Sequence, residues 1–259
     1  APGRQRRCDG ATHMRLLLDL GNTRLKWAWQ SLPDGWLAHG AVDWREDLES
    51  TLESAWVELS RPTQVIAASV VDAAREAQVA AWVQRTLDLP VTWLRTPAQA
   101  CGVRNAYAEP QRLGVDRFLA MVAAYAAGHA PCVLVGVGTA LTLDALAADG
   151  QHLGGLIAPG PQLMQQSLFD ATARIRPVRP GQLVELADNT ADAVASGCWQ
   201  AAAALVDRFA SRMAVRLGTV PELVLGGGDA QALLPLLSQP ARLSHDAVLR
   251  GLAIWANAS

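Results

Sequence analysis

Residues 16–24 of the chain read Leu16-Leu17-Leu18-Asp19-Leu20-Gly21-Asn22-Thr23-Arg24. The short apolar run is typical of a buried strand, and the residues from Asp19 onward are typical of a polar turn. Such a turn brings a carboxylate and approachable backbone N–H groups to one point, and these are the groups that a phosphate and its Mg2+ require. A plain β-turn uses the same residue types, so this segment alone leaves both interpretations open.

A second glycine turn, Gly136-Val137-Gly138-Thr139, also follows an apolar strand, Cys132 to Val135. Around each turn the apolar pattern predicts a meander of three strands. These strands are expected at 15–20, 24–30 and 36–42 in the first half, and near 132–136, 139–146 and 152–157 in the second. The repetition predicts two similar halves with a cleft between them, although their sequence identity is too weak to define a repeat.

Helices and further strands alternate after each meander, which is the order expected of an α/β fold. In the first half we expect helices at 45–59 and 72–87 and strands at 64–70 and 91–94. In the second half we expect helices at 112–128, after Pro159-Gly160-Pro161, at 190–217 and at 246–256, and a strand at 222–225. We place the domain boundary at 113/114, which leaves a polar tail at 1–13, one domain at 14–113 and another at 114–259.

The composition is that of an ordinary globular protein. A chain of 259 residues can bury one large core or two modest ones, and 51% hydrophobic against 18% charged residues provides enough apolar surface for either. The net charge of −2 and the pI near 6.2 offer no basic surface for nucleic acid or for an anionic membrane. We therefore expect neither partner.

The four cysteines are irregularly spaced, and no apolar run reaches the ~20 residues that a membrane span requires. They are Cys8, Cys101, Cys132 and Cys198. We expect reduced thiols and a cytoplasmic location. The His13-Met14 junction suggests that Met14 is the natural start and that residues 1–13 are an upstream or expression remnant.

Four motifs in this order resemble those of the type III pantothenate kinases, a family within the superfamily of actin, hexokinase and the Hsp70 ATPase. They are Asp19 to Thr23, Asn105-Ala106-Tyr107 through Pro110 to Leu113-Gly114-Val115-Asp116-Arg117, Gly138 to Asp144, and Gly154 to Gly160. The resemblance implies two ribonuclease-H-like (actin-like ATPase) α/β domains. It also implies a homodimer that uses ATP and Mg2+ to phosphorylate pantothenate to 4′-phosphopantothenate, the entry step to coenzyme A.

The resemblance assigns the pantothenate site mainly to the second motif. It makes Asp116 the group that accepts the proton of the pantothenate hydroxyl, although a helix cap or an ion pair with Arg117 would also explain this carboxylate. Arg117 has donors suited to a carboxylate, and pantothenate carries one. The other pantothenate residues implied are Tyr107, Gly114, Val115 and, from the neighbouring subunit, Thr190, which could equally be a helix N-cap.

The same resemblance assigns the ATP and phosphate site to the two glycine turns. Asp19 is expected to hold Mg2+, directly or through water. Gly21, Asn22, Thr23, Lys26, Gly138, Thr139 and Gly227 are expected to meet phosphate or adenosine. A solvated strand face would also explain Lys26, and a strand-to-helix turn would explain Gly226-Gly227-Gly228.

At one position the chain departs from the family pattern. Many members have an Asp two residues before the glycine of the second turn, where it binds an activating K+ or NH4+, but this chain has Gly136. The missing carboxylate places the cation dependence in doubt. Asp144, at the far end of the same hairpin, is open to two interpretations, a residue near the cleft or a partner in a turn.

Two other functions compete with this one. The first is another small-metabolite kinase or phosphatase of the same superfamily. The second is a nucleotide-binding transcriptional accessory or regulatory protein that has kept the fold and lost the transfer step. The intact Asp116-Arg117 pair argues against the second.

Overall fold

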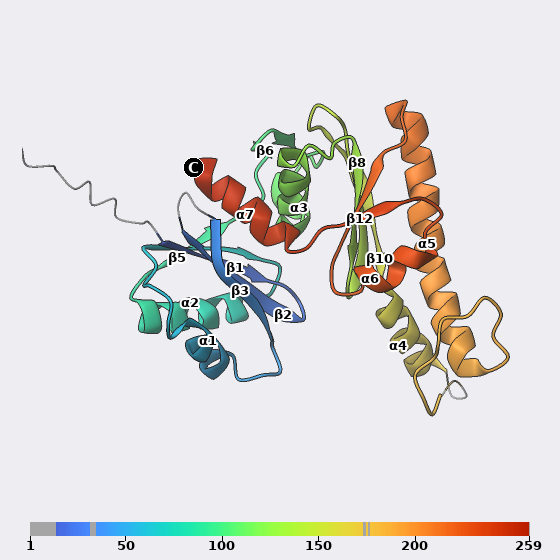
Figure 1. Ribbon diagram of the computed structural model, residues 1–259, viewed down its shortest axis with the longest axis horizontal. Helices are drawn as coiled ribbons and strands as arrows, with labels where there is room; N and C mark the ends of the chain where they lie inside the picture. Colours follow the sequence, from blue (N-terminus) through green and yellow to red (C-terminus); the bar gives the residue numbers. More distant parts are fainter. Residues whose placement is uncertain (1–13, 32–34, 173–174, 176, 259) are drawn as a thin grey trace, which may run out of the picture. The chain divides into compact units, whose positions relative to one another are not determined.

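The structure, a computed structural model, describes residues 14–31, 35–172, 175 and 177–258. It consists of two compact units, of which unit 1 ends at Leu94 and unit 2 begins at Arg95 (Figure 1). The expected tail at 1–13 lies outside the described residues. Each unit contains one five-stranded sheet, in agreement with the two-domain α/β fold that the sequence predicts.

Unit 1 is a sheet of order β3-β2-β1-β4-β5 with two helices. Its elements are β1 (Met14–Leu20), β2 (Arg24–Ser31), β3 (Gly35–Asp43), α1 (Leu48–Trp56), β4 (Gln64–Ser69), α2 (Ala73–Leu87) and β5 (Val91–Leu94). Strand β1 is central, antiparallel to β2 and parallel to β4. This position explains why Leu16, Leu17 and Leu18 are all fully buried.

Four buried tryptophans, Trp27, Trp29, Trp56 and Trp82, belong to the core of unit 1. Trp56 on α1 packs edge-on against Trp29 of the sheet, with 5.1 Å between the ring centres, and also contacts Trp82 on α2. Seven of the nine tryptophans belong to this unit: Trp27, Trp29, Trp36, Trp44, Trp56, Trp82 and Trp93. Helix α1 is shorter than predicted at its start, because the Asp47 carboxylate accepts the backbone N–H of Ser50 and caps it there.

Unit 2 repeats the sheet plan in the order β10-β9-β8-β11-β12. Before the sheet come β6 (Gln99–Ala100), β7 (Val103–Arg104), the 3-10 turn η1 (Pro110–Arg112) and α3 (Val115–Ala126). The sheet and its helices are β8 (Cys132–Val137), β9 (Ala140–Leu146), β10 (His152–Pro159), α4 (Pro161–Ala171), α5 (Thr190–Leu217), β11 (Glu222–Gly226), α6 (Ala230–Leu233), η2 (Leu234–Leu236), β12 (Ala241–Leu243) and α7 (Ala247–Ala258).

Helices cover both faces of the unit 2 sheet (Figure 1). Val133 and Val135 of β8 pack in one core with Trp199 of α5, whereas Leu134 packs in the opposite core with Phe118 of α3. A strand that is buried on both faces has a continuous run of apolar residues in place of an alternating pattern, and β8 has such a run from Cys132 to Val135. Cys132, at the start of β8, is fully buried, and burial raises the pKa of its thiol to about 12.

The segment from Arg95 to Leu113 belongs to unit 2, although the predicted boundary at 113/114 assigned it to the first domain. Its buried residues Val103 and Leu113 pack with Phe118 in the core beneath α3. The short strands β6 and β7 pair with each other in a separate two-stranded sheet and do not extend the sheet of unit 1. Packing, which is not visible in the local sequence pattern, therefore determines where this segment belongs.

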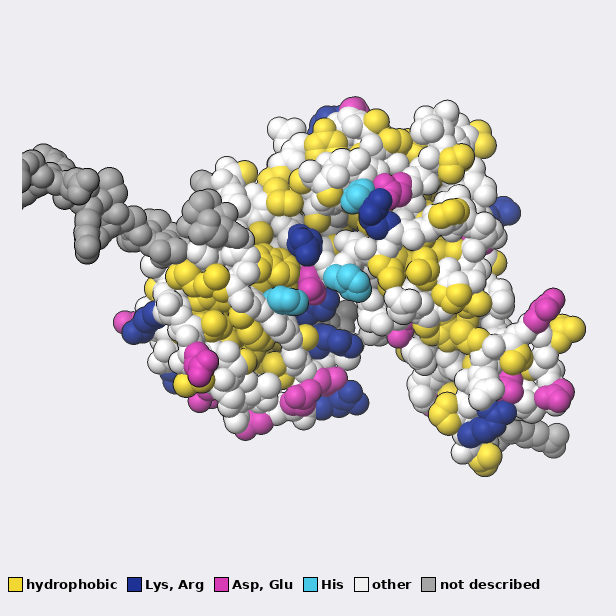
Figure 2. Space-filling view, viewed as in Figure 1, with side chains coloured by type: hydrophobic (Ala, Val, Ile, Leu, Met, Phe, Trp, Pro, Cys, Tyr) yellow, Lys and Arg dark blue, Asp and Glu magenta, His cyan; other side chains and the backbone are white. Residues whose placement is uncertain are grey.

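One end of unit 2 exposes several large apolar side chains. We call it the apolar end, and it comprises Leu163 and Leu168 of α4 and Leu183, Val184 and Leu186 of the segment before α5. Leu186 is 90% exposed. Figure 2 shows hydrophobic side chains on this part of the surface. Among the described residues, no helix is both long and apolar enough to cross a membrane.

Candidate active site

The first glycine turn joins β1 to β2 in unit 1. Asp19 is 9% exposed, and its register partner across the hairpin is Lys26. The N–H of Gly21 donates to the carbonyl of Arg24 over 3.1 Å, and the Trp44 indole donates to the Gly21 carbonyl over 2.7 Å. These bonds fix the turn while the side chains of Asn22 and Thr23 remain exposed. The turn thus presents polar groups beside a nearly buried carboxylate and a cationic strand residue.

The second glycine turn, Gly138-Thr139, joins β8 to β9 in unit 2. A side chain at Gly138 would meet open space, so ligands can approach its backbone, and Thr139 is exposed. Gly160 lies directly against the carbonyl of Gly138, and its N–H donates to the Thr139 carbonyl over 2.9 Å. Gly227, at φ +100°, packs against the backbone of Val137, where any Cβ would overlap it. The structure therefore brings three predicted residues, Gly138, Thr139 and Gly227, to one edge of the sheet.

Position 136 has no space for a longer side chain without a local shift. Gly136 pairs with Thr142 across the hairpin, and a Cβ at Gly136 would fall against the Thr142 hydroxyl. The oxygen nearest this position is therefore a neutral hydroxyl instead of a carboxylate. No group of three or more potential metal-ligating His, Cys, Asp or Glu residues occurs in the part of the chain that the structure describes.

The predicted pantothenate residues of the second motif lie together around the start of α3. Gly114 is the N-cap residue, and a Cβ there would crowd the Asp116 carboxylate at 2.5 Å. That carboxylate accepts the backbone N–H of Arg117 over 2.8 Å and is partly buried. Burial raises the pKa of Asp116, as does the nearby charge of Asp144, although Arg117 opposes the shift. The Asp116 side chain therefore keeps a fixed orientation at a helix N-terminus.

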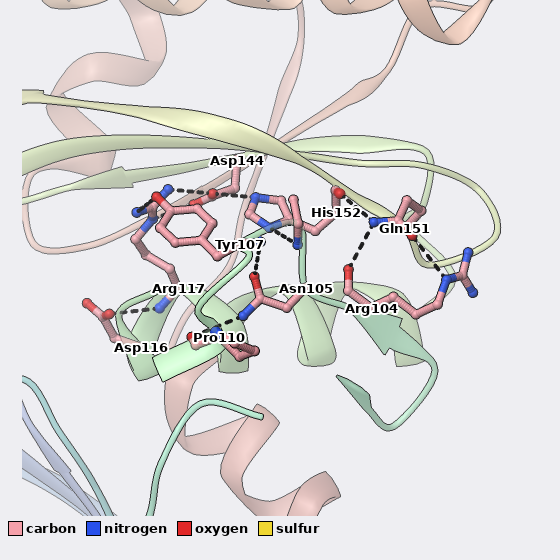
Figure 3. A network of polar contacts seen from close by, with 10 residues as sticks. Arg104, Asn105, Tyr107, Pro110, Asp116, Arg117, Asp144, Gln151 and His152 are labelled. Atoms are coloured by element: carbon pink, nitrogen blue, oxygen red, sulfur yellow. Dashed lines mark hydrogen bonds and ion pairs between the residues drawn. The ribbon is translucent and has the colours of Figure 1, made fainter. Parts of the chain in front are cut away.

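The guanidinium of Arg117 pairs with Asp144 (Figure 3). The Asp116 carboxylate bonds to Arg117 only at the backbone N–H. Its Nε and Nη2 donate to the two carboxylate oxygens of Asp144 over 2.8 Å and 2.6 Å. Its Nη1 donates to the Tyr107 hydroxyl over 3.3 Å. The alternative of a side-chain ion pair between Asp116 and Arg117 is therefore wrong.

Asp144 is fully enclosed within β9 and takes no part in a strand-end turn. His152 Nε2 lies 2.9 Å from its Oδ1, and the His152 ring is completely buried. Burial opposes the charge of Asp144, but the hydrogen bonds from His152 and Arg117 outweigh it and lower its pKa. His152 carries no motif that would predict a role for it, although a carboxylate inside an apolar strand indicates that its partners lie on the facing elements.

Thr190 is the first residue of α5, directly after the segment that carries Leu183, Val184 and Leu186 of the apolar end. It is not the N-cap: the side chain of Asn189 accepts the N–H of Asp192 and caps the helix. Buried Asp192 also pairs with Arg179, whose Nη1 lies 2.8 Å from Oδ1, and accepts the N–H of Gln182. The segment before α5 is thereby tied to the helix, with Thr190 exposed at its end.

Comparison of the sequence with known proteins shows the family to which the chain belongs. The family model described as type III pantothenate kinase matches residues 15–212. The type III pantothenate kinase of Laribacter hongkongensis is 41% identical over 247 residues, which are 95% of this chain and 100% of that protein. The enzyme of the same name from Xanthomonas campestris pv. campestris (strain B100) is 43% identical over 94% of this chain and 97% of its own length.

Solved structures show the same fold at low identity. The (R)-2-hydroxyglutaryl-CoA dehydratase component A of Acidaminococcus fermentans is 14% identical with a TM-score of 0.53, and covers 95% of this chain and 98% of its own. The activator of 2-hydroxyisocaproyl-CoA dehydratase from Clostridium difficile, solved with ADPNP, is 12% identical with a TM-score of 0.52, and covers 95% and 94%. At this identity the likeness concerns the fold alone.

Proposed function

The chain belongs to the type III pantothenate kinase family, and we propose that it uses ATP to phosphorylate pantothenate to 4′-phosphopantothenate, the first step of coenzyme A biosynthesis. The observation that carries the proposal is the intact group around the start of α3, where Asp116 is fixed beside Arg117 and Tyr107. A regulatory protein that had lost the transfer step would have no need to keep a partly buried carboxylate there, where burial disfavours its charge.

We assign the proton-accepting role to Asp116. The pantothenate hydroxyl oxygen forms the new bond to the γ-phosphorus of ATP, the bond from that phosphorus to ADP breaks, and the hydroxyl proton passes to the Asp116 carboxylate. Phosphoryl transfer depends mainly on positioning and charge stabilisation, so an oriented carboxylate suffices without being a strong base. Gly114 and Val115 would line the pantothenate site beside it, because they precede Asp116 in the same turn.

The two glycine turns supply the groups proposed for ATP. In unit 1, the carboxylate of Asp19 suits Mg2+, directly or through water, and Gly21, Asn22, Thr23 and Lys26 suit phosphate. In unit 2, the open backbone at Gly138, the exposed Thr139 hydroxyl and the close approach at Gly227 suit phosphate and adenosine. Mg2+ would neutralise the phosphate charge during transfer.

We also propose that the protein is a homodimer formed through the apolar end of unit 2. Exposed leucines lie on α4 and on the segment that leads into α5. The first residue of α5 is Thr190, which the family resemblance assigns to the partner's pantothenate site. Large apolar side chains left exposed in one region of a surface are a feature of interaction sites. The cytoplasmic location stays a prediction from the sequence and the family resemblance.

A coupled assay of ADP production tests the function directly. The protein is mixed with ATP and Mg2+, and turnover is measured with and without pantothenate, each in the presence and absence of K+. We expect ADP to form only when pantothenate is present. If pantothenate produces no turnover with or without K+, the regulatory alternative is favoured. If another small alcohol supports turnover and pantothenate does not, the alternative of another small-metabolite kinase is favoured.

A further inference from the structure

Three charged or polar side chains form a buried group, and the proposed chemistry gives a role to Arg117 but none to Asp144 or His152. Asp144 is 3% exposed, His152 is 0% exposed and Arg117 is 8% exposed. Taking charges out of water is costly, and apolar residues of similar volume are often at least as stable as a buried ion pair. The group therefore needs an explanation beyond stability of the fold, and its position beside Tyr107 and Asp116 suggests one (Figure 3).

The pairing with Asp144 determines which donors of Arg117 remain for a ligand. A guanidinium has five N–H donors. Asp144 accepts from Nε and Nη2, and Tyr107 accepts from Nη1. One N–H on Nη1 and one on Nη2 are left. Because Asp144 already balances the positive charge, Arg117 offers a ligand two oriented donors instead of an unpaired cation.

The hydrogen bonds of His152 define its tautomer. The ionised Asp144 carboxylate can only accept, so Nε2 must carry the proton that it shares with Oδ1 at 2.9 Å. Nδ1 is then an acceptor, and it receives the backbone N–H of Ala106 over 3.4 Å. The ring of His152 also stacks on Tyr107, with 15° between the planes. One buried ring thus connects Asp144 to the segment that carries Tyr107.

The glycine motif of β10 makes room for this arrangement. A Cβ at Gly155 would overlap the Leu143 carbonyl and would lie 2.6 Å from the Asp144 carboxylate and 3.0 Å from the Arg117 guanidinium. Gly155 pairs with Asp144 across the β9–β10 hairpin. The absence of a side chain at this position therefore permits the ion pair.

We propose that Asp144 and His152 are positioning residues for pantothenate, a role that rests on the proposed function. Asp144 fixes the orientation of the Arg117 guanidinium, and His152 holds both Asp144 and the Ala106-Tyr107 backbone. Arg117 and Tyr107 then meet the substrate without first being ordered, so the cost of ordering is met during folding. Neither positioning residue touches the reacting atoms.

The test is the pair of variants His152→Gln and His129→Gln. Glutamine at 152 keeps a donor for Asp144 but leaves the Ala106 N–H without its acceptor. His129 is the matched control, because its Nδ1 also lies beside a carboxylate, 3.1 Å from Glu222 in the same unit. We expect His152→Gln to raise the KM for pantothenate by up to about tenfold, the size expected for the loss of one hydrogen bond, while the KM for ATP changes little. His129→Gln should change neither.

A second measurement keeps the proposal separate from the activity itself. Hydrogen exchange followed by mass spectrometry should show faster exchange in the peptide containing Ala106 and Tyr107 for His152→Gln, and wild-type exchange for His129→Gln. If the wild-type protein does not phosphorylate pantothenate, the proposed function is wrong. The exchange comparison still tests whether His152 holds the Ala106-Tyr107 segment in place. Unchanged exchange in His152→Gln, an equal rise in both KM values, or the same effect in His129→Gln would overturn the proposal.

Discussion

Asp116 is held in an environment that disfavours its charge. Burial raises its pKa, so the folded protein favours the protonated form more than the unfolded chain does. By linkage, the stability associated with protonated Asp116 is present below the unfolded pKa and is lost as the pH rises through the folded pKa. At neutral pH the ionised Asp116 side chain therefore lowers the stability of the fold. Its role as proton acceptor requires this ionised form.

Replacing Asp116 by Asn should consequently separate activity from stability. The amide oxygen can still accept the Arg117 N–H, but it cannot take up the hydroxyl proton. We expect kcat to fall by ~10²–10⁴, the usual contribution of a general base, with unchanged ATP affinity and a melting temperature at or above that of wild type. Steady-state kinetics, ATP titration and thermal unfolding measure the three quantities. Turnover within a few-fold of wild type would show that Asp116 is not the acceptor.

The pH dependence of kcat/KM provides an independent check on the same carboxylate. Activity requires ionised Asp116, so the rate should fall as the pH drops through its pKa. Because that pKa is raised, the acid limb should lie above pH ~4, the ordinary value for Asp. A profile measured from mildly acidic to neutral pH tests this. An acid limb at the ordinary value of Asp would assign the titration to another group.

Gly155→Ala tests the space that the Arg117–Asp144 pair requires. The added methyl group would overlap backbone and crowd both charged side chains, so we expect a loss of about 1–3 kcal/mol in the free energy of unfolding, as for overpacking. Gly197→Ala is the matched control, since a Cβ at this α5 position meets nothing and Ala favours a helix. Denaturant unfolding should give opposite signs for the two variants. Equal effects would contradict the packing argument.

At the scale of elements, local pattern predicts much of the fold. The three-strand meanders lie close to their predicted positions because alternation and turn residues encode them, and the helix at 190–217 matches α5. Asp144 could have been predicted as a buried partner. It lies between Leu143 and Ala145 in an apolar strand, and its side chain faces the elements that carry Arg117 and His152. The identity of these partners was not predictable, because they come from separate segments.

The turn between β8 and β9 carries the prediction on monovalent cations. With Gly136 opposite the Thr142 hydroxyl, no carboxylate is available at the position that binds K+ or NH4+ in many relatives. We expect kcat to change by less than about twofold when K+ replaces Na+, since a neutral hydroxyl holds a weakly bound cation poorly. Initial rates in matched chloride salts measure this. A large stimulation by K+ alone would show that other oxygens form the site.

At the scale of the molecule, the apolar end predicts the oligomeric state. Leu186→Asp places a charge on its most exposed leucine and should convert the dimer to a monomer in analytical ultracentrifugation. Pantothenate binding should weaken as well, because Thr190, the residue proposed for the partner's site, opens the helix that follows this segment. Val57→Asp is the matched control, a charge at a valine that is 79% exposed in unit 1. This variant should remain dimeric. A monomeric wild-type protein would refute the proposal, as would a dimeric Leu186→Asp variant.

The division between the two units and the identity of the α5 cap could not be predicted from the sequence. Residues 95–113 join unit 2 through Val103 and Leu113, whose burial depends on α3, and no composition change marks the division. For Thr190 the N-cap alternative is wrong, because Asn189 caps α5, although either side chain could accept the free N–H groups of the first turn. The division depends on packing between segments distant along the chain, whereas the cap depends on which of two adjacent side chains accepts the bond.

The uneven distribution of tryptophan and cysteine gives each unit its own spectroscopic reporter. Intrinsic fluorescence arises mostly from unit 1, which contains seven of the nine tryptophans. Cys132 of unit 2 is fully buried and its pKa is about 12, so it can react with an alkylating reagent only when its strand opens. Fluorescence and thiol labelling, followed in the same denaturant series, would therefore reveal whether the two units unfold together or in sequence, without any engineered label.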